Sequence, residues 1–245
     1  MDRDQLRQRL EFYQDLGFKQ IYLRPAVDAN PISDAVPIDM PTLPELPELP
    51  PMAPTGDSLL RIVEDIGDCH RCRLHEKRNK IVFGVGNEKA KLVFVGEGPG
   101  ADEDAQGIPF VGRAGQLLTQ MIEGTSKKEG IPLLRADVYI CNVVKCRPPE
   151  NRTPEADEME ICGQFLFRQL STIQPRAICA LGSTAAKALL GGKDGVTRLR
   201  GRWHKWRDIP LIVTYHPSYL LRPYNQDAKR EAWEDLKKVL HFVYD

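Results

Sequence analysis

Six cysteines stand in the 245-residue chain, and four of them have the setting of metal ligands. Cys69 and Cys72 form a C-x-x-C pair, whereas Cys146 in VVKCRPP and Cys162 in EICGQF lie singly among polar residues. Four thiolates can hold either a tetrahedral zinc ion or a [4Fe–4S] cluster. The gap between Cys72 and Cys146 is wide for a zinc finger, whose ligands usually fall within about 30 residues of one another. The spacing therefore favours a cluster over zinc only slightly.

Polar residues also stand where two short apolar runs end. LVFVG (92–96) is followed by GEGPG, which contains Glu97 and Gly98, and VYICN (138–142) ends in Asn142. The glycines let the backbone approach a flat ligand closely, while an acid within the turn disfavours phosphate. The amide of Asn142 offers both donors and an acceptor, so it can bind the edge of a pyrimidine.

The segment ADEDAQGIPFVGRAG (101–115) has two possible interpretations. Asp102, Glu103 and Asp104 form either a solvated acidic loop or part of a site, with about equal weight. Phe110 is either a core residue or a platform on which a base stacks.

The last apolar run leads into HPSYLLR (216–222), an unusual composition for a simple loop. His216 is followed by leucines that we expect to be exposed, including Leu220, and then by Arg222. An apolar wedge beside a cation suits DNA, since the wedge can enter the base stack while arginine holds a phosphate. Upstream, RLRGRWHKWR (198–207) contains five Arg or Lys residues and two Trp, which strengthens the nucleic-acid interpretation.

Strands and helices alternate along the chain from Gly56 onward. Apolar runs predict strands at 92–96, 138–142, 177–182 and 211–215. Helical patterns occupy 57–65, with Asp57 as N-cap, and 114–124, 155–172, 183–190 and 227–243. This alternation predicts an α/β fold with three αβα layers around a central four-stranded parallel sheet. Cys141 and Cys179 lie inside two of the runs, so we expect them to be buried apolar residues.

The chain before Gly56 differs in composition from the rest. Residues 1–24 carry a helical apolar stripe, and 25–55 include nine prolines, which predict an extended linker. The helix either docks on the folded domain, 56–245, or binds a protein partner, with equal weight.

Overall charge names no partner, because 34 basic residues balance 34 acidic ones. Residues 56–245 carry 29 basic and 25 acidic residues, a mild excess that permits nucleic-acid binding. No apolar run approaches the ~18 residues that span a bilayer, and the charged N-terminus is unlike a signal peptide. We therefore expect a cytoplasmic protein without membrane contact, whose thiols stay reduced.

Taken in order, these motifs resemble the family 4 uracil-DNA glycosylases, the iron–sulfur branch of that superfamily. The resemblance covers about residues 57–243. It rests on GEGPG with PFVGRAG, NVVKCRPP-x-NRTP, the C-x15-C spacing from Cys146 to Cys162, ALGSTAAKALLG and HPSYLLR. The chain lacks the R-R-I-H insertion of the related branch that bonds covalently to uracil-DNA, which disfavours that branch.

The resemblance implies an enzyme of base excision repair that flips uracil from DNA and hydrolyses its N-glycosidic bond. We also expect the protein to be a monomer. The implied ligands of a structural [4Fe–4S] cluster are Cys69, Cys72, Cys146 and Cys162. The implied uracil-binding residues are Glu97, Gly98, Glu103, Phe110, Asn142 and His216. Among these, Glu97 and His216 are the implied catalytic residues, with Glu103 assisting, while Leu220 and Arg222 would contact DNA.

Three other functions compete with this interpretation. The chain could be a non-catalytic DNA-binding module with zinc, or an enzyme acting on a different deaminated base in the same pocket. A redox protein centred on C-x-x-C is disfavoured because the pair lies outside any βαβ turn.

Overall fold

A computed structural model describes residues 54–222 and 225–245, which fall within the compact unit Leu49–Asp245. The predicted helix at 1–24 and nearly all of the predicted linker at 25–55 lie outside the described residues. In the described ranges, none of the helices has the length and apolar character needed to span a bilayer.

Four parallel strands form the centre of the sheet, at the four predicted positions. They are β2 (Leu92–Gly96), β3 (Tyr139–Asn142), β4 (Ala177–Leu181) and β6 (Ile209–Thr214). Their order is β3-β2-β4-β6, so the chain crosses over between neighbours. The central four-stranded parallel sheet is thus confirmed.

The whole sheet is larger than the sequence predicted. Short strands β1 (Val85–Gly86) and β5 (Trp203–Trp206) pair antiparallel with β3 and β6, giving six strands in the order β1-β3-β2-β4-β6-β5. Strands β1 and β5 form the two edges of the sheet, and most of their residues are exposed or only partly buried. Neither strand therefore needs the apolar run by which a buried strand is recognised.

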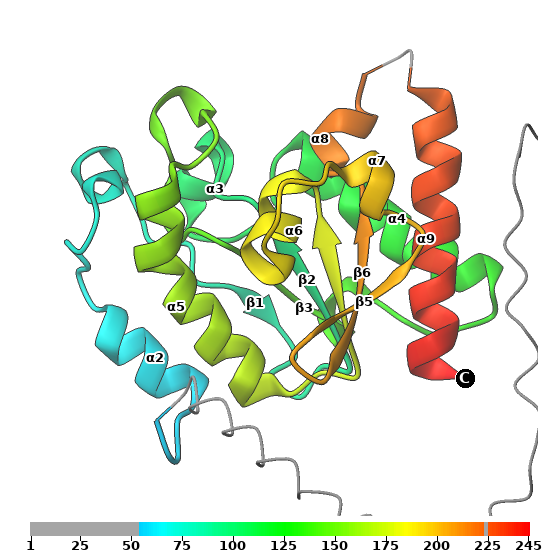
Figure 1. Ribbon diagram of the computed structural model, residues 1–245, viewed down its shortest axis with the longest axis horizontal. Helices are drawn as coiled ribbons and strands as arrows, with labels where there is room; N and C mark the ends of the chain where they lie inside the picture. The colour runs from blue at the N-terminus through cyan, green and yellow to red at the C-terminus, as the bar shows by residue number, and fades with distance from the viewer. Residues whose placement is uncertain (1–53, 223–224) are drawn as a thin grey trace, which may run out of the picture. The chain divides into compact units, whose positions relative to one another are not determined.

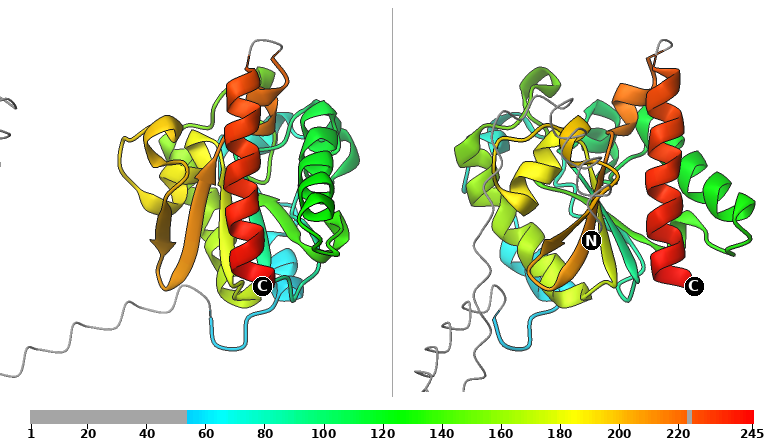
Figure 2. Two further views of the ribbon diagram at one scale, coloured as in Figure 1. Left: turned by 90° about the vertical axis from the view of Figure 1, so that its right-hand side faces the viewer. Right: turned by 45° about the vertical axis from the view of Figure 1, so that its right-hand side comes forward.

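Helices cover both faces of the sheet, as Figures 1 and 2 show. One face packs against α2 (Leu59–Ile66), α5 (Ala156–Ile173) and α6 (Ser183–Leu190), and the other against α4 (Arg113–Lys128) and α9 (Gln226–Tyr244). Side chains alternate between faces along each strand: Val93 and Val95 join the first layer, whereas Leu92 and Phe94 join the second. Cys141 and Cys179 are both fully buried, as expected.

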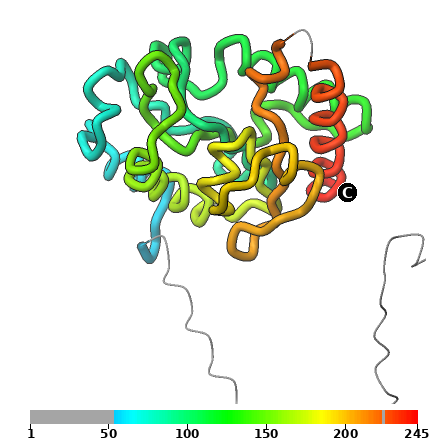
Figure 3. The backbone as a smooth tube through the Cα atoms, turned by 45° about the horizontal axis from the view of Figure 1, so that its top comes forward, coloured from blue at the N-terminus to red at the C-terminus, as the bar shows by residue number. Residues whose placement is uncertain are grey.

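Shorter helices connect these elements, several of them near the carboxyl ends of the strands. Those of α type are α3 (Ala101–Gln106), α7 (Val196–Leu199) and α8 (Pro217–Leu220), and those of 3-10 type are η1 (Arg73–Lys77), η2 (Arg135–Asp137) and η3 (Pro149–Asn151). Figure 3, in which the top of Figure 1 comes forward, follows the chain through these connections.

The start of α2 corrects the predicted N-cap. Ser58, not Asp57, caps the helix, because its hydroxyl accepts from the N–H of Arg61 at 3.2 Å. Asp57 instead accepts from the Nε and Nη2 atoms of Arg168 at 2.8 and 3.1 Å, which ties α2 to α5. Arg168 also lowers the pKa of the Asp57 carboxyl.

Arg168 also donates to the carboxylate of Asp65. Replacing Arg168 with Met should reduce the free energy of unfolding by about 1–3 kcal/mol, because Asp57 and Asp65 lose their shared partner. Urea titrations measure this loss. Since the folded-state pKa of Asp57 lies below its ordinary value of 3.8, the difference from wild type should be complete above that pH and shrink below it. The exposed ion pair of Arg230 with Asp227 provides the control: Arg230→Met should change stability by less than about 0.5 kcal/mol. Equal losses in both variants would contradict a clamping role for Arg168.

Candidate active site

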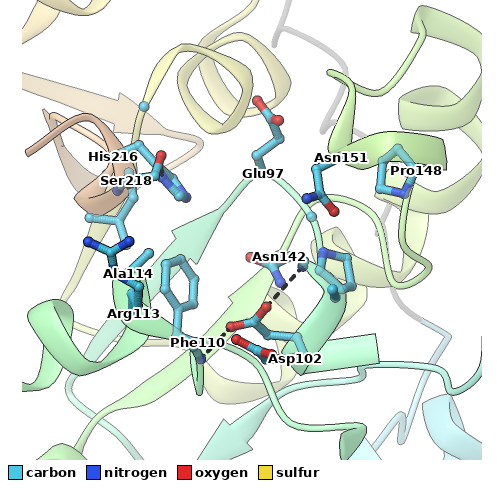
Figure 4. Close-up of a pocket in the computed structure, with 18 of the residues that line it drawn as sticks. Glu97, Asp102, Phe110, Arg113, Ala114, Asn142, Pro148, Asn151, His216 and Ser218 are labelled. Carbon is cyan, nitrogen blue, oxygen red and sulfur yellow. Dashed lines mark hydrogen bonds between the residues drawn. The ribbon is translucent and has the colours of Figure 1, made fainter. Parts of the chain in front are cut away.

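A cavity of about 460 Å³ opens at the carboxyl edge of the parallel strands. All six residues expected to bind uracil line it: Glu97, Gly98, Glu103, Phe110, Asn142 and His216. Figure 4 labels Glu97, Phe110, Asn142 and His216 among them. They lie at the end of β3 or in the segments that follow β2 and β6, and the carboxyl ends of these parallel strands meet at one edge. Ligands of open α/β sheets bind at such an edge, so the topology explains why these distant segments converge.

Phe110 forms an aromatic wall in a constrained backbone. Its φ is +54°, its side chain is 6% exposed, and its ring centre lies 5.6 Å from that of His216. A Cβ atom at Gly115 would stand 1.9 Å from the carbonyl of Phe110, and one at Gly96 would stand 2.6 Å from its ring. Two glycines therefore leave the space that this ring and its strained backbone require.

Asn142, the last residue of β3, carries an unsatisfied acceptor. Its side chain is 1% exposed, and its Oδ1 atom is buried without a hydrogen-bond partner among the described residues. A buried polar atom left unpaired costs about 1–3 kcal/mol. Because Asn142 also lines the cavity, a ligand that donates a hydrogen bond to Oδ1 would recover this energy.

His216 is held as a neutral ring with a defined tautomer. The N–H of Ser218 donates to Nδ1 of His216 at 3.2 Å, so the ring proton is on Nε2. Burial lowers the pKa of His216 to about 4, which keeps the ring uncharged at neutral pH. Nε2–H is thus the group that this residue can donate to a ligand in the cavity.

Glu97 has a partner that sequence reasoning missed. The hydroxyl of Thr184, a buried residue in the first turn of α6, donates to Oε2 of Glu97. A threonine within a helix gives no signal of its own, and ALGSTAAKALLG contributed only to the family resemblance. At the neighbouring Gly98, a Cβ would come within 2.7 Å of Val144, so the turn packs closely against the segment after β3.

The carboxylate of Glu103 is occupied by the backbone. Oε2 accepts from the N–H of Gly100 at 3.0 Å, and Oε1 accepts from the N–H groups of Val111 and Gly112, both at 2.9 Å. These bonds, partly visible in Figure 4, tie the loop that carries Phe110 to the start of α3. The geometry therefore supports a positioning role for Glu103.

The loop after β6 differs from the predicted wedge. Leu220 is 1% exposed because α8 turns its side chain towards Ala228 and Ala232 of α9, so the expectation of an exposed leucine is wrong at this position. Tyr219 is 39% exposed, and the guanidinium of the exposed Arg222 lies 5.7 Å from its ring. Among the described residues of this loop, Ser218, Tyr219 and Arg222 are exposed.

The basic, aromatic segment 198–207 also has a structural explanation. Arg200 donates to Asp235 at 3.0 Å, and Trp206 stacks on Phe167 at 5.8 Å between ring centres. The segment includes the edge strand β5, so part of its basic and aromatic character stabilises the fold. Its composition is therefore weaker support for DNA binding than we expected.

Residues 83–237, more than half of the chain, match the family model described as the uracil DNA glycosylase superfamily. The chain belongs to this superfamily. It is 46% identical to a type-4 uracil-DNA glycosylase of Thermotoga maritima over 192 residues, covering 77% of this chain and 97% of the relative. It is 44% identical to a type-4 uracil-DNA glycosylase of Archaeoglobus fulgidus, covering 75% and 92%. A type-5 uracil-DNA glycosylase of Pyrobaculum aerophilum is 30% identical, with coverages of 63% and 71%. The chain is thus a member of the type-4 branch.

In this type-4 chain, a second cavity is lined by all four expected ligands: Cys69, Cys72, Cys146 and Cys162. Three of their sulfurs face N–H donors. The backbone N–H of Lys145 donates to Cys162 at 3.2 Å, while Arg78 and Arg71 lie 3.6 and 3.9 Å from the sulfurs of Cys146 and Cys69. Such donors stabilise electron-rich sulfur, so the site suits a thiolate-ligated cluster. Among the described residues, no three His, Cys, Asp or Glu side chains gather closely enough to hold a single metal ion.

Gly115→Ala should displace Phe110 and lower the free energy of unfolding by about 2 kcal/mol or more, because a methyl group cannot share space with a backbone carbonyl. Chemical denaturation measures the effect. Gly124 lies in the same helix, and a Cβ there meets nothing within 4 Å. Gly124→Ala should instead stabilise the protein by about 0.5–1 kcal/mol. If Gly115→Ala were as stable as Gly124→Ala, the backbone conformation of Phe110 would not require a glycine at position 115.

Proposed function

We propose that the cavity at the carboxyl edge binds a uracil flipped out of DNA, and that the chain hydrolyses the N-glycosidic bond and leaves an abasic site. Membership of the type-4 uracil-DNA glycosylases supports this activity. The observation that carries the assignment of the pocket is the buried, unpaired Oδ1 of Asn142.

The hydrogen-bonding groups of uracil are complementary to those of the Asn142 side chain. Its N3–H can donate to Oδ1 of Asn142 while its O4 accepts from the amide nitrogen, and its ring can stack on Phe110. Cytosine has an acceptor at N3 and an amine at C4, which reverses both polarities. A polar site rejects such a mismatch strongly because its own groups then stay unpaired.

The proposed chemistry follows the charges that develop as the bond breaks. The sugar gains oxocarbenium character and uracil leaves as an anion, so stabilisation must act on both. Nε2–H of His216 is the proposed donor to O2 of the departing uracil. A neutral imidazole fits this position because Nδ1 accepts from the N–H of Ser218 while Nε2–H remains free to donate.

Glu97 is the proposed residue that positions the attacking water and stabilises the sugar cation. The hydroxyl of Thr184 holds one of its carboxylate oxygens, leaving the other to act in the cavity. Glu103 is proposed to act indirectly, through the loop that carries Phe110.

DNA contact is proposed for the exposed part of the loop after β6. Flipping a base costs a few kcal/mol, which contacts with the flipped base and the opened stack must offset. Arg222 is proposed to contact a phosphate, and Tyr219 is exposed beside it. Leu220 could enter the base stack only by leaving its buried cluster, so the wedge role is not assigned to it.

A structural [4Fe–4S] cluster is proposed for the second cavity, held by Cys69, Cys72, Cys146 and Cys162. The support is that all four residues line one cavity and that N–H groups face three of the sulfurs. When bound, such a cluster would tie the segment before η1 to the loop after β3 and to α5. The monomeric state, the cytoplasmic location and a protein partner for residues 1–24 stay predictions.

His216→Ala should lower the single-turnover rate of uracil release from a single-stranded oligonucleotide about 100-fold, since one preorganised donor contributes roughly 3 kcal/mol. His241, which pairs with Glu129 and Asp245 far from the cavity, provides the control. His241→Ala should keep the wild-type rate. A His216→Ala enzyme as fast as wild type would remove this residue from the chemistry.

The pH dependence of release should reflect the lowered pKa of His216. Because the folded-state pKa is about 4 rather than 6.5, the ring stays neutral at pH 6.5, and only near pH 4 does Nδ1 gain a proton and lose its bond from the N–H of Ser218. Stability should also fall between these two values as pH decreases, since there the unfolded chain binds the proton more readily. Rate profiles of wild type and His216→Ala measure the first effect. A wild-type inflection near 6.5 that disappears in the variant would contradict it.

Protein purified without oxygen should absorb visible light and contain about four irons per chain. Cys162→Ala should lose most of this iron, whereas Cys179→Ala, at a fully buried strand position outside the cavity, should retain it. Metal analysis and absorption spectra measure both. Colourless protein with one zinc ion per chain is the contrary result.

A further inference from the structure

Lys145 lies buried between the cysteine cavity and the uracil pocket. Its side chain is 1% exposed and lines the cysteine cavity, and it follows Asn142 by three residues. Among the described residues, Lys145 forms no ion pair with a carboxylate. A buried side chain of this type is unusual, because lysine is almost never fully buried unless it is paired.

The ammonium group donates only to neutral acceptors. Nζ lies 2.7 Å from the carbonyl oxygen of Asn142 and 2.6 Å from Oε1 of Gln169. Gln169 is fixed in turn, because its Nε2 donates to the carbonyl of Phe83 at 3.0 Å and to the hydroxyl of Tyr139 at 3.1 Å. Nζ of Lys145 therefore has hydrogen-bond partners, but no anionic side chain among the described residues balances its positive charge. A buried charge costs several kcal/mol unless an anion balances it.

The cysteine site can supply that anion. The backbone N–H of Lys145 donates to the sulfur of Cys162 at 3.2 Å, and the next residue is the proposed ligand Cys146. A centre held by four thiolates is electron-rich, and its charge acts strongly across a dry interior. Burial lowers the pKa of the Lys145 ammonium, and the acidic groups that oppose this shift are the core residue Cys141, which does not line the cavity, and Cys162.

We infer that Lys145 is a positioning residue that couples the cysteine-ligated centre to uracil recognition. The anionic centre balances its ammonium, and the ammonium fixes the main-chain carbonyl of Asn142, whose side chain bears the unpaired Oδ1. The inference rests on the proposed function. It gives the centre a role beyond holding loops together, because uracil binding and retention of the centre then stabilise each other.

The test measures iron loss to a chelator with and without saturating 1-methyluracil, whose methyl group stands in for the sugar. In wild type, the ligand should slow iron loss about fivefold or more, the lower range of typical coupling between sites. Lys145→Met keeps the length of the side chain but removes its charge and donors. In this variant the ratio of the two rates should approach one, and the dissociation constant of 1-methyluracil should rise about tenfold.

Two further variants make the result decisive. Lys193→Met changes an exposed loop lysine and should behave as wild type. Gln169→Glu places a carboxylate beside Nζ, so Lys145 no longer needs the centre and the ratio should again approach one; this arm decides the question if Lys145→Met fails to fold.

Two results would overturn the coupling. One is that a folded Lys145→Met or Gln169→Glu variant shows the same ratio of iron-loss rates as wild type; the other is that 1-methyluracil does not slow iron loss from wild type. Uracil release by wild type is measured in parallel. Release without coupling refutes only this inference, whereas absence of release refutes the proposed function as well.

Discussion

The buried, unpaired Oδ1 of Asn142 is the feature on which the rest of the account depends. Folding buries this acceptor at the end of a central strand, beside the cavity, and leaves it without a donor among the described residues. The protein tolerates this cost because the fold is held elsewhere, by two apolar layers on either side of the sheet. A ligand that donates a hydrogen bond to Oδ1 removes the free-energy cost of the unpaired acceptor. The cavity is therefore selective for ligands with a donor at that position.

The remaining wall residues are fixed by hydrogen bonds and close packing from neighbouring groups. Glu103 holds the loop of Phe110 through the backbone N–H groups of Val111 and Gly112, and Gly115 leaves room for the strained backbone of Phe110. Ser218 sets the tautomer of His216 in the same way. Preorganisation of this kind matters because donors already in place need not reorganise as charge develops.

Much of this arrangement could be predicted from the sequence because it follows from apolar runs. The four central strands are recognisable since they are buried on both faces, and strand topology then places Glu97, Asn142 and His216 at one edge. The edge strands β1 and β5 and the short helices α3 and α8 were missed because they are brief and only partly buried. The same limit explains Leu220, whose burial depends on how α8 packs against α9.

Positioning residues were the hardest to predict. Glu103 and Asp104 are adjacent acids, yet Glu103 binds the Phe110 loop and the fully buried Asp104 accepts from the backbone of Asn79 at 2.9 Å. No local pattern distinguishes such residues from a solvated acidic loop. Thr184 and Lys145 were likewise invisible, because their partners lie on other elements or on the main chain.

Competition between two isomeric ligands tests the central claim most directly. 1-Methyluracil carries its methyl group where the sugar is attached in DNA and keeps the N3–H donor, whereas 3-methyluracil has lost that donor. If Oδ1 of Asn142 receives N3–H, 1-methyluracil should inhibit uracil release about as well as free uracil, and 3-methyluracil should inhibit at least about tenfold more weakly. Equal inhibition by the two isomers would show that this buried oxygen does not recognise the base.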